Sequence, residues 1–203
     1  MIALSAAIGV ACAAPPKPSP ESPVPQELPP APQELEIAPP PCLEIVRIEV
    51  WKHDHTLQAF CKGGATITMK VALGREEIGP KTRSGDHRTP EGKYRISKKA
   101  SASRFHLFLP IDYPSKEDAE AALQEGRVSA AEYERVVEAH ERGVSPPHDT
   151  VLGGHLGFHG EGERWRGDSK DIDWTYGCIA VTDAEIEFLA ERVEPGVPVW
   201  IHP

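Results

Sequence analysis

The chain has 203 residues and a formal net charge of −9, with 22 Lys and Arg against 31 Asp and Glu. Nucleic acids and anionic membranes are bound through clustered Lys and Arg, so this balance argues against both as the main partner. A pocket for a specific substrate is still possible, because a local site can differ in sign from the whole chain.

The first twelve residues are small and apolar, too few to span a bilayer, and they end in Val10-Ala11-Cys12. This ending resembles a bacterial lipoprotein signal, in which the cysteine is lipidated and becomes the mature N-terminus. Gly9 stands where such signals usually have Leu, and no Lys or Arg precedes the apolar run. We expect a signal over residues 1–12 with a lipid anchor at Cys12, and an ordinary N-terminal tail is the alternative.

A proline-rich stretch follows over residues 13–41. It holds twelve of the 21 prolines of the chain, no aromatic residue and few apolar ones. Such a composition cannot bury enough surface to fold, and it favours an extended polyproline-like chain of about 3.1 Å per residue. We therefore expect a tether or spacer here and one folded domain over residues 42–203.

The pattern then changes to short alternating runs of apolar residues separated by turns. We predict strands over residues 43–51, 56–60, 65–73, 93–97, 105–109, 157–159 and 197–201. Pro198 cannot donate to a strand ladder, so it should lie at a sheet edge or at a strand start. Short strands with frequent turns favour a β-rich core over a doubly wound parallel sheet.

A long loop and three helices complete the expected elements. The loop over residues 74–92 is rich in Gly, Pro and charged residues, and loops of this length in a compact domain are usually functional or mobile. Capping signals predict helices after Ser115, Ser129 and Thr182, where Ser129 pairs with Glu132 and Thr182 with Glu185.

The candidate nucleophile is Cys178, in the glycine-containing stretch Trp174-Thr-Tyr-Gly-Cys-Ile-Ala-Val181. A thiol becomes a useful nucleophile when a neighbour favours the thiolate, most often a histidine. His159 lies nineteen positions upstream at a strand end, and Gly177 permits a tight backbone path that exposes the sulfur. On spacing alone this pattern is weak, because a buried inert cysteine is the commoner case.

A second histidine lies close to His159 in the sequence. Positions 155, 157 and 159 alternate onto one strand face, so we expect His155 and His159 to point the same way. A metal held by both histidines and Cys178 can be imagined, but no third ligand falls at a recognisable zinc spacing. We predict no metal and no cofactor, and we expect His155 to line the groove or its edge. His140 is interpreted as a packed or surface helix residue.

The cysteines also bear on the cellular compartment. If Cys12 carries lipid and Cys178 is a free nucleophile, Cys42 and Cys61 remain as a pair for an oxidising compartment. The predicted hairpin does not force this pairing, because it places Cys61 opposite about Arg47, several residues from Cys42. A disulfide and two free thiols both stay open.

From about Leu43 to Pro203 the chain resembles the L,D-transpeptidase catalytic family, often called the YkuD domain. The stretches that carry the resemblance are Gly79-Pro-Lys81, Gly85-Asp86, Thr89-Pro-Glu-Gly92 with Tyr94, Leu152-Gly-Gly154, Phe158-His-Gly160, Asp173-Trp-Thr-Tyr-Gly-Cys-Ile-Ala180 and Pro195-Gly-Val-Pro-Val-Trp-Ile-His-Pro203. Seven such stretches in the family's order argue against coincidence.

The resemblance implies a mainly β (α+β) fold: a small β-sandwich with a helical insertion and a short helix after the catalytic cysteine. It makes Cys178 the nucleophile and His159 its base. Backbone amides around Gly177 and Cys178 are expected to bind the oxyanion, and Thr175 to support the histidine or contact substrate. The remaining candidates for substrate or oxyanion contacts are Tyr176, Gly160 and His155.

The reaction that the resemblance implies is peptidoglycan L,D-transpeptidation in the bacterial periplasm or cell envelope. Cys178 would attack the third residue of a stem tetrapeptide, release D-alanine and pass the acyl group to an amine. That amine belongs to another stem peptide or to an envelope protein. Ala180 and Val181 stand where many members have Arg or Asn, and Tyr176 stands where His or Asp is common, so the substrate contacts stay open.

Two alternatives accompany this prediction. With water as the acceptor, the protein is an L,D-carboxypeptidase, or an amidase that releases envelope proteins from peptidoglycan. A non-catalytic peptidoglycan-binding module with the same fold is the other, and the presence of both Cys178 and His159 argues against it.

Overall fold

The computed structural model describes residues 41–163 and 170–203. The predicted signal over residues 1–12, the lipid anchor at Cys12 and all but the last residue of the proline-rich stretch lie outside these described residues. None of the helices found in the described part is both long enough and apolar enough to cross a membrane.

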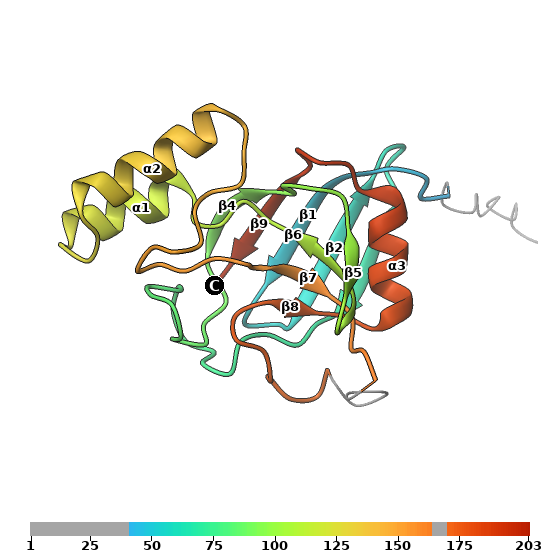
Figure 1. The fold of residues 1–203 in the computed structure, drawn as a ribbon. Helices are drawn as coiled ribbons and strands as arrows, with labels where there is room; N and C mark the ends of the chain where they lie inside the picture. The colour runs from blue at the N-terminus through green and yellow to red at the C-terminus, as the bar shows by residue number, and fades with distance from the viewer. Residues whose placement is uncertain (1–40, 164–169) are drawn as a thin grey trace, which may run out of the picture. The chain divides into compact units, whose positions relative to one another are not determined.

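The larger of two sheets has five strands in the order β3-β2-β1-β9-β4 (Figure 1). Their bounds are β1 Ile45–Trp51, β2 Thr56–Cys61, β3 Thr66–Lys70, β4 Gly92–Arg95 and β9 Pro198–His202. The first three strands form an antiparallel meander. The last strand of the chain, β9, enters between β1 and β4, parallel to β1 and antiparallel to β4. Pro198 starts it, as predicted.

The smaller sheet has four strands in the order β5-β6-β7-β8. Their bounds are β5 Ser101–Ser103, β6 His106–Pro110, β7 Gly157–His159 and β8 Ile179–Ala180. The short strands β7 and β8 run parallel, with Phe158 paired to Ile179 and His159 to Ala180. This pairing places the segment after Cys178 directly beside the strand that carries His159.

Both sheets contribute to one hydrophobic core. Strands of the larger sheet bury Ile48 and Leu57, and strands of the smaller sheet bury Leu109, Phe158 and Ile179 in the same cluster. The alternating sequence of β1 explains why Ile48 and Val50 are buried, because every second side chain of an amphipathic strand faces the core. Helix α3, Asp183–Arg192, packs against β6 and β7. The predicted mainly β fold is therefore confirmed.

A helical hairpin is inserted between β6 and β7. It consists of α1, Lys116–Gln124, and α2, Ala130–Glu141, which pack against each other. Both helices begin with complete capping boxes, from Ser115 and Ser129, which supply partners for amides that the first turn leaves unpaired. Figure 1 shows this pair at one end of the sheets and α3 at the other.

One predicted strand is shorter than expected. The run over residues 65–73 ends as a strand at Lys70, and the chain then crosses to the smaller sheet. Ala72 forms an isolated bridge with Ala180, and Gly74 forms one with Thr175. The alternation continues past Lys70 because these residues pair with a different partner, which a one-dimensional pattern does not reveal. Strand β5 was not predicted, since its three residues are exposed and have no apolar alternation.

Cys42 and Cys61 form a disulfide with a Cα–Cα distance of 5.3 Å. The predicted register was wrong at this point: Cys61 pairs with Ile45, and Arg47 pairs with Phe60. A bulge at Val46 supplies the extra residue on β1, so Cys61 comes closer to Cys42 than a regular hairpin allows. Cys178 is a free thiol.

Candidate active site

The segment that carries Cys178 is fixed by residues far away in the sequence. Asp173 accepts a hydrogen bond from the Leu73 amide at 2.7 Å and pairs with His55 Nε2 at 3.0 Å. At the other end, the amides and carbonyls of Ala72 and Ala180 exchange hydrogen bonds at 3.0 and 2.8 Å. Cys178 therefore lies on a short stretch that is held at both ends.

Gly177 and Thr175 shape the turn between those two ends. The Thr175 hydroxyl donates to the Cys178 carbonyl at 2.7 Å and accepts from the Gly177 amide at 3.0 Å. Gly177 has a φ of 123°, and a Cβ there would meet the Arg88 carbonyl oxygen at 2.5 Å. Only glycine fits this backbone. The hydrogen bonds of the Thr175 hydroxyl thus go to the backbone of the nucleophile and not to His159.

His159 is buried at the end of β7, and its ring is held on three sides. Phe105 stacks on it with a centroid distance of 4.5 Å, and Trp174 meets its edge at 5.3 Å. Nδ1 lies 2.7 Å from the Gly160 carbonyl oxygen. Because a carbonyl oxygen only accepts, Nδ1 carries the proton and Nε2 is left as an unprotonated acceptor. The ring is therefore in the tautomer of a general base.

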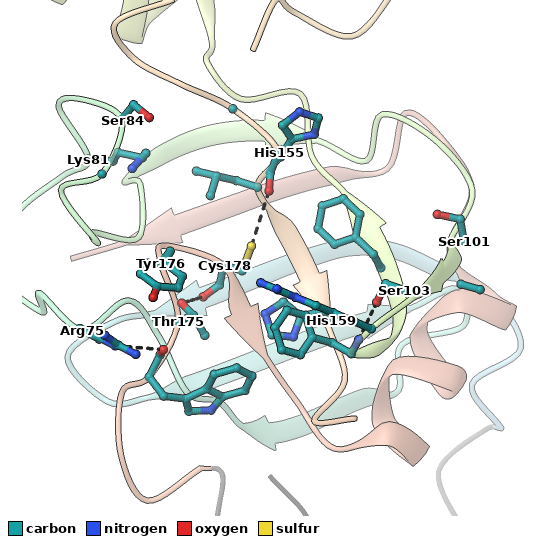
Figure 2. Close-up of a pocket in the computed structure, with 18 residues that line it drawn as sticks. Arg75, Lys81, Ser84, Ser101, Ser103, His155, His159, Thr175, Tyr176 and Cys178 are labelled. Atoms are coloured by element: carbon teal, nitrogen blue, oxygen red, sulfur yellow. Dashed lines mark hydrogen bonds between the residues drawn. The ribbon is translucent and has the colours of Figure 1, made fainter. Parts of the chain in front are cut away.

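The sulfur of Cys178 points to the pocket between two histidine residues (Figure 2). It donates to the His155 carbonyl oxygen at 3.6 Å, and Figure 2 shows the ring of His159 on its other side. The His155 ring turns away, because this residue has a φ of 56°, and it stacks on His148 at 3.8 Å. The expected strand alternation from 155 to 159 fails at this kink, so the carbonyl of His155 faces the sulfur and its ring does not.

The surroundings leave both members of the pair neutral. Burial raises the pKa of Cys178 to about 11, against the opposing effects of the Gly157 amide and the Lys81 charge. Burial lowers the pKa of His159 below 6.5, although the bond to Gly160 opposes this. At neutral pH the resting site therefore holds a neutral thiol and a neutral imidazole.

The 74–92 loop is anchored beside this pair by a buried ion pair. Lys81 and Asp86 are 2.7 Å apart, and their side chains are 3% and 7% exposed. Burial by itself would raise the pKa of Asp86, but hydrogen bonds from Lys81 and from the backbone amides of the loop lower it to about 2. Both residues belong to stretches that carried the family resemblance, but sequence reasoning gave them no role.

A cavity of about 770 Å³ opens above Cys178. Of the predicted site residues, His155, His159, Thr175, Tyr176 and Cys178 line it, whereas Gly160 and Gly177 are not among its lining residues. Tyr176 is exposed and packs against His87 and Arg75, with a ring distance to His87 of 4.7 Å. Over residues 41–163 and 170–203, no group of three or more His, Cys, Asp or Glu is arranged to hold a metal ion.

Besides Lys81, several residues that line this cavity were given no role by sequence reasoning, among them Trp174, Phe105, Arg75 and Arg104. Trp174 lay inside the quoted motif, so its position was available as a signal. Phe105 lay in a predicted strand, and nothing local marked it as a partner of His159. Arg75 and Arg104 are exposed residues of a loop and of the β5–β6 turn, and no periodicity or spacing singles them out.

A β-sandwich whose pocket holds a free cysteine and a neutral histidine has the arrangement found in enzymes that use a cysteine–histidine pair. The chain belongs to the YkuD family, the L,D-transpeptidase catalytic domain, whose sequence profile matches residues 45–201.

Solved structures are similar to this chain at low sequence identity. The helical cell shape determining protein Pgp2 of Campylobacter jejuni, as a K307A mutant, is 19% identical with a TM-score of 0.50, over 77% of this chain and 46% of that chain. An Enterococcus faecium L,D-transpeptidase C442S mutant is 16% identical with a TM-score of 0.44, over 78% of this chain and 50% of that one. This chain thus spans about half the length of these proteins. Comparison with curated proteins gives no match.

Proposed function

We propose that the protein is a peptidoglycan L,D-transpeptidase in which Cys178 is the nucleophile and His159 the base. The observation that carries the proposal is the neutral thiol beside a buried imidazole whose proton is fixed on Nδ1 by the Gly160 carbonyl. Membership of the L,D-transpeptidase catalytic-domain family supports the substrate class.

The acylation step follows from this arrangement. His159 Nε2 takes the thiol proton while the Cys178 sulfur bonds to the carbonyl carbon of the third residue of a stem tetrapeptide. The bond from that carbon to the D-alanine nitrogen then breaks, and the leaving amine takes the proton from His159. The product is a thioester on Cys178 and free D-alanine.

A developing oxyanion needs donors close to the sulfur. Of the two amides expected there, the Gly177 amide is already bonded to Thr175. We therefore assign the main oxyanion contact to the Cys178 amide, with Thr175 holding the turn that presents it. Tyr176, exposed at the mouth of the pocket, is assigned to substrate contact.

The second step transfers the acyl group to an amine. His159 takes a proton from the acceptor as its nitrogen bonds to the thioester carbon, and the departing sulfur regains a proton. The pocket has two sides that could receive donor and acceptor: Ser101 and Ser103 lie on one side of the Cys178–His159 pair and Lys81 and Tyr176 on the other (Figure 2). Donor and acceptor can approach the thiol from different directions.

The proposed place of action is the bacterial cell envelope. The Cys42–Cys61 disulfide supports an oxidising compartment such as the periplasm. A lipid anchor at Cys12 with the proline-rich tether would hold the domain near a membrane, and both remain proposals because they lie outside the described residues. Stem peptides are the proposed partners, with an envelope protein as a further acceptor.

The test is incubation of the full chain with purified muropeptide tetrapeptides, followed by mass spectrometry of protein and products. The wild type should gain the mass of the tripeptide acyl group and form cross-linked dimers. Shortened tripeptides without dimers would identify the hydrolase instead. Cys178→Ala should abolish the adduct and all turnover, and Cys178→Ser, which keeps the shape of the site, should retain binding with at most trace acylation. Preserved turnover in Cys178→Ala would overturn the proposal.

A further inference from the structure

The pocket of this acidic chain is lined by cations. Its described lining residues include Arg75, Lys81 and Arg104 but no Asp or Glu, although the whole chain has 31 acidic residues against 22 basic ones. Cations in a partly enclosed pocket raise the local concentration of an anionic ligand. The charge of the pocket therefore indicates a substrate with carboxylates.

The charge of Lys81 is already paired within the described residues, whereas the charges of the two arginines are not. Lys81 is buried in its ion pair with Asp86. Arg75 is exposed and uses Nε to donate to the Trp174 carbonyl at 3.3 Å, so its terminal nitrogens have no protein partner over residues 41–163 and 170–203. Within the same ranges, the exposed Arg104 has neither a hydrogen bond nor an ion pair.

Aromatic rings hold both guanidinium groups in place. Arg75 lies 5.0 Å from the ring centre of Tyr176, and Arg104 lies 4.7 Å from that of Phe105. A ring behind a guanidinium restricts its motion and leaves its planar fork of N–H donors free for a carboxylate. The two arginines are thus oriented before any ligand binds.

They stand on opposite sides of the reacting pair. Arg75 bonds to the backbone of the Cys178 segment, on the side of Tyr176, whereas Arg104 follows Ser103 in the β5–β6 turn, on the side where Phe105 stacks against His159. Figure 2 shows Arg75 and Ser103 with Cys178 and His159 between them. A peptide with its scissile carbonyl at Cys178 would extend toward one arginine in each direction.

We propose that Arg75 and Arg104 are specificity-determining residues that each bind one carboxylate of the donor peptide. One carboxylate is the C-terminal group of the leaving residue, and the other lies on the acyl side of the scissile bond. The pocket then selects stem peptides with free carboxylates over peptides that carry amides there. The inference rests on the proposed acyl transfer to Cys178 and specifies the donor for it.

The experiment compares three synthetic tetrapeptides as donors to the full chain: one with all carboxylates free, one with a C-terminal amide and one with amides on the acyl side. The readout is kcat/KM for thioester formation, by mass spectrometry. The wild type should prefer the free peptide over each amidated one by about tenfold or more, because a charge-assisted bidentate pair is lost. Arg75→Gln should erase one of the two preferences and Arg104→Gln the other.

Controls separate specificity from general damage. Arg142→Gln changes an exposed arginine at the end of α2 whose side chain pairs with Glu138, and it should leave all three rates unchanged. Arg75→Lys and Arg104→Lys should keep part of the preference, since the charge remains but the fork is lost. A variant that slows all three donors equally acts through structure, and this would overturn the assignment of that arginine.

The two proposals fail in different ways. If the wild type forms a thioester at equal rates with all three peptides, the carboxylate inference is overturned and the proposed function stands. If the wild type forms no thioester with any of the three, the proposed function itself fails, and the inference fails with it.

Discussion

The segment of residues 173–180 and the helical hairpin of residues 115–143 are held in contrasting ways. The first is bonded to Leu73, His55 and Ala72, about one hundred residues earlier in the chain. The second begins each helix with a capping box whose partners are three residues apart. The start of each hairpin helix is therefore held locally, although Ala119, Ala122 and Val136 join the shared core. The Cys178 segment instead depends on a frame that exists only in the folded chain.

Substitutions in these two regions should therefore have different effects on activity. A change at a helix cap or at the turn of the hairpin removes one local interaction and leaves that frame intact. A change in the nucleophile segment moves the sulfur relative to His159, and catalysis is sensitive to misplacements of about 1 Å. We therefore expect activity and stability to change together in the segment of residues 173–180. In the hairpin we expect stability alone to change.

The largest effect is expected at Gly177. In Gly177→Ala, the new Cβ would lie 2.5 Å from the Arg88 carbonyl oxygen at a φ of 123°. Steric overlap and backbone strain together should lower the free energy of unfolding by about 3 kcal/mol. Thioester formation should fall by about one hundredfold or more, because the sulfur shifts. Chemical denaturation and acylation kinetics measure the two effects.

The hairpin offers a matched control for this substitution. Gly126 also has a positive φ, of 68°, but a Cβ there would meet nothing within 4 Å. Gly126→Ala should therefore cost only the backbone strain, about 1 kcal/mol, and leave acylation unchanged. Equal losses of activity in the two variants would mean that the Cys178 segment is no more sensitive to substitution than the hairpin.

The next effect is the pH dependence of acylation. In the proposed mechanism neutral His159 is the base. Burial lowers its pKa, so protonation should remove this base only at pH values below 6.5. In kcat/KM, the acid limb should lie below pH 6.5 and fall about tenfold per pH unit beneath the pKa of His159. Activity loss with a midpoint at or above 6.5 would contradict the neutral imidazole.

Alkylation of Cys178 by iodoacetamide tests the other half of the pair. Because burial raises the pKa of this thiol to about 11, the alkylation rate of the free protein should keep rising well above pH 9. A rate that levels off near neutral pH would instead indicate a preformed thiolate and imidazolium.

The sequence predicts the hairpin better than the Cys178 segment, because the hairpin helices are marked by local patterns and the segment is held by long-range contacts. Both hairpin helices and their caps follow from patterns within a few residues, and so do the strands β1, β2 and β9. Residue types made Cys178 and His159 only weak candidates, and the family resemblance was needed to pair them, because their proximity depends on the parallel pairing of β7 and β8. The kink at His155 and the cations Arg75 and Arg104 have no local signal.

Thr175→Val should have a smaller effect on the nucleophile segment. The change keeps the shape of the side chain but removes the hydroxyl that bonds the Gly177 amide and the Cys178 carbonyl. The buried groups left unpaired should cost about 1–3 kcal/mol of unfolding free energy, and acylation should slow by about tenfold. Thr175→Ser, which keeps the hydroxyl, should restore most of both. An inactive but equally stable Thr175→Ser would mean that the methyl group is what matters.

The smallest effect is expected for Ser129→Ala at the start of α2. Loss of the N-cap should lower the unfolding free energy by about 1 kcal/mol, seen as a small drop in Tm, with no change in acylation. Ser129→Asp, which can still accept from the Glu132 amide, should retain most of the stability. Glu132 also accepts from the Val151 amide, four residues before His155. A slower acylation in Ser129→Ala would therefore contradict a purely local role for this cap and would point to the Glu132–Val151 contact as its connection to the thiol.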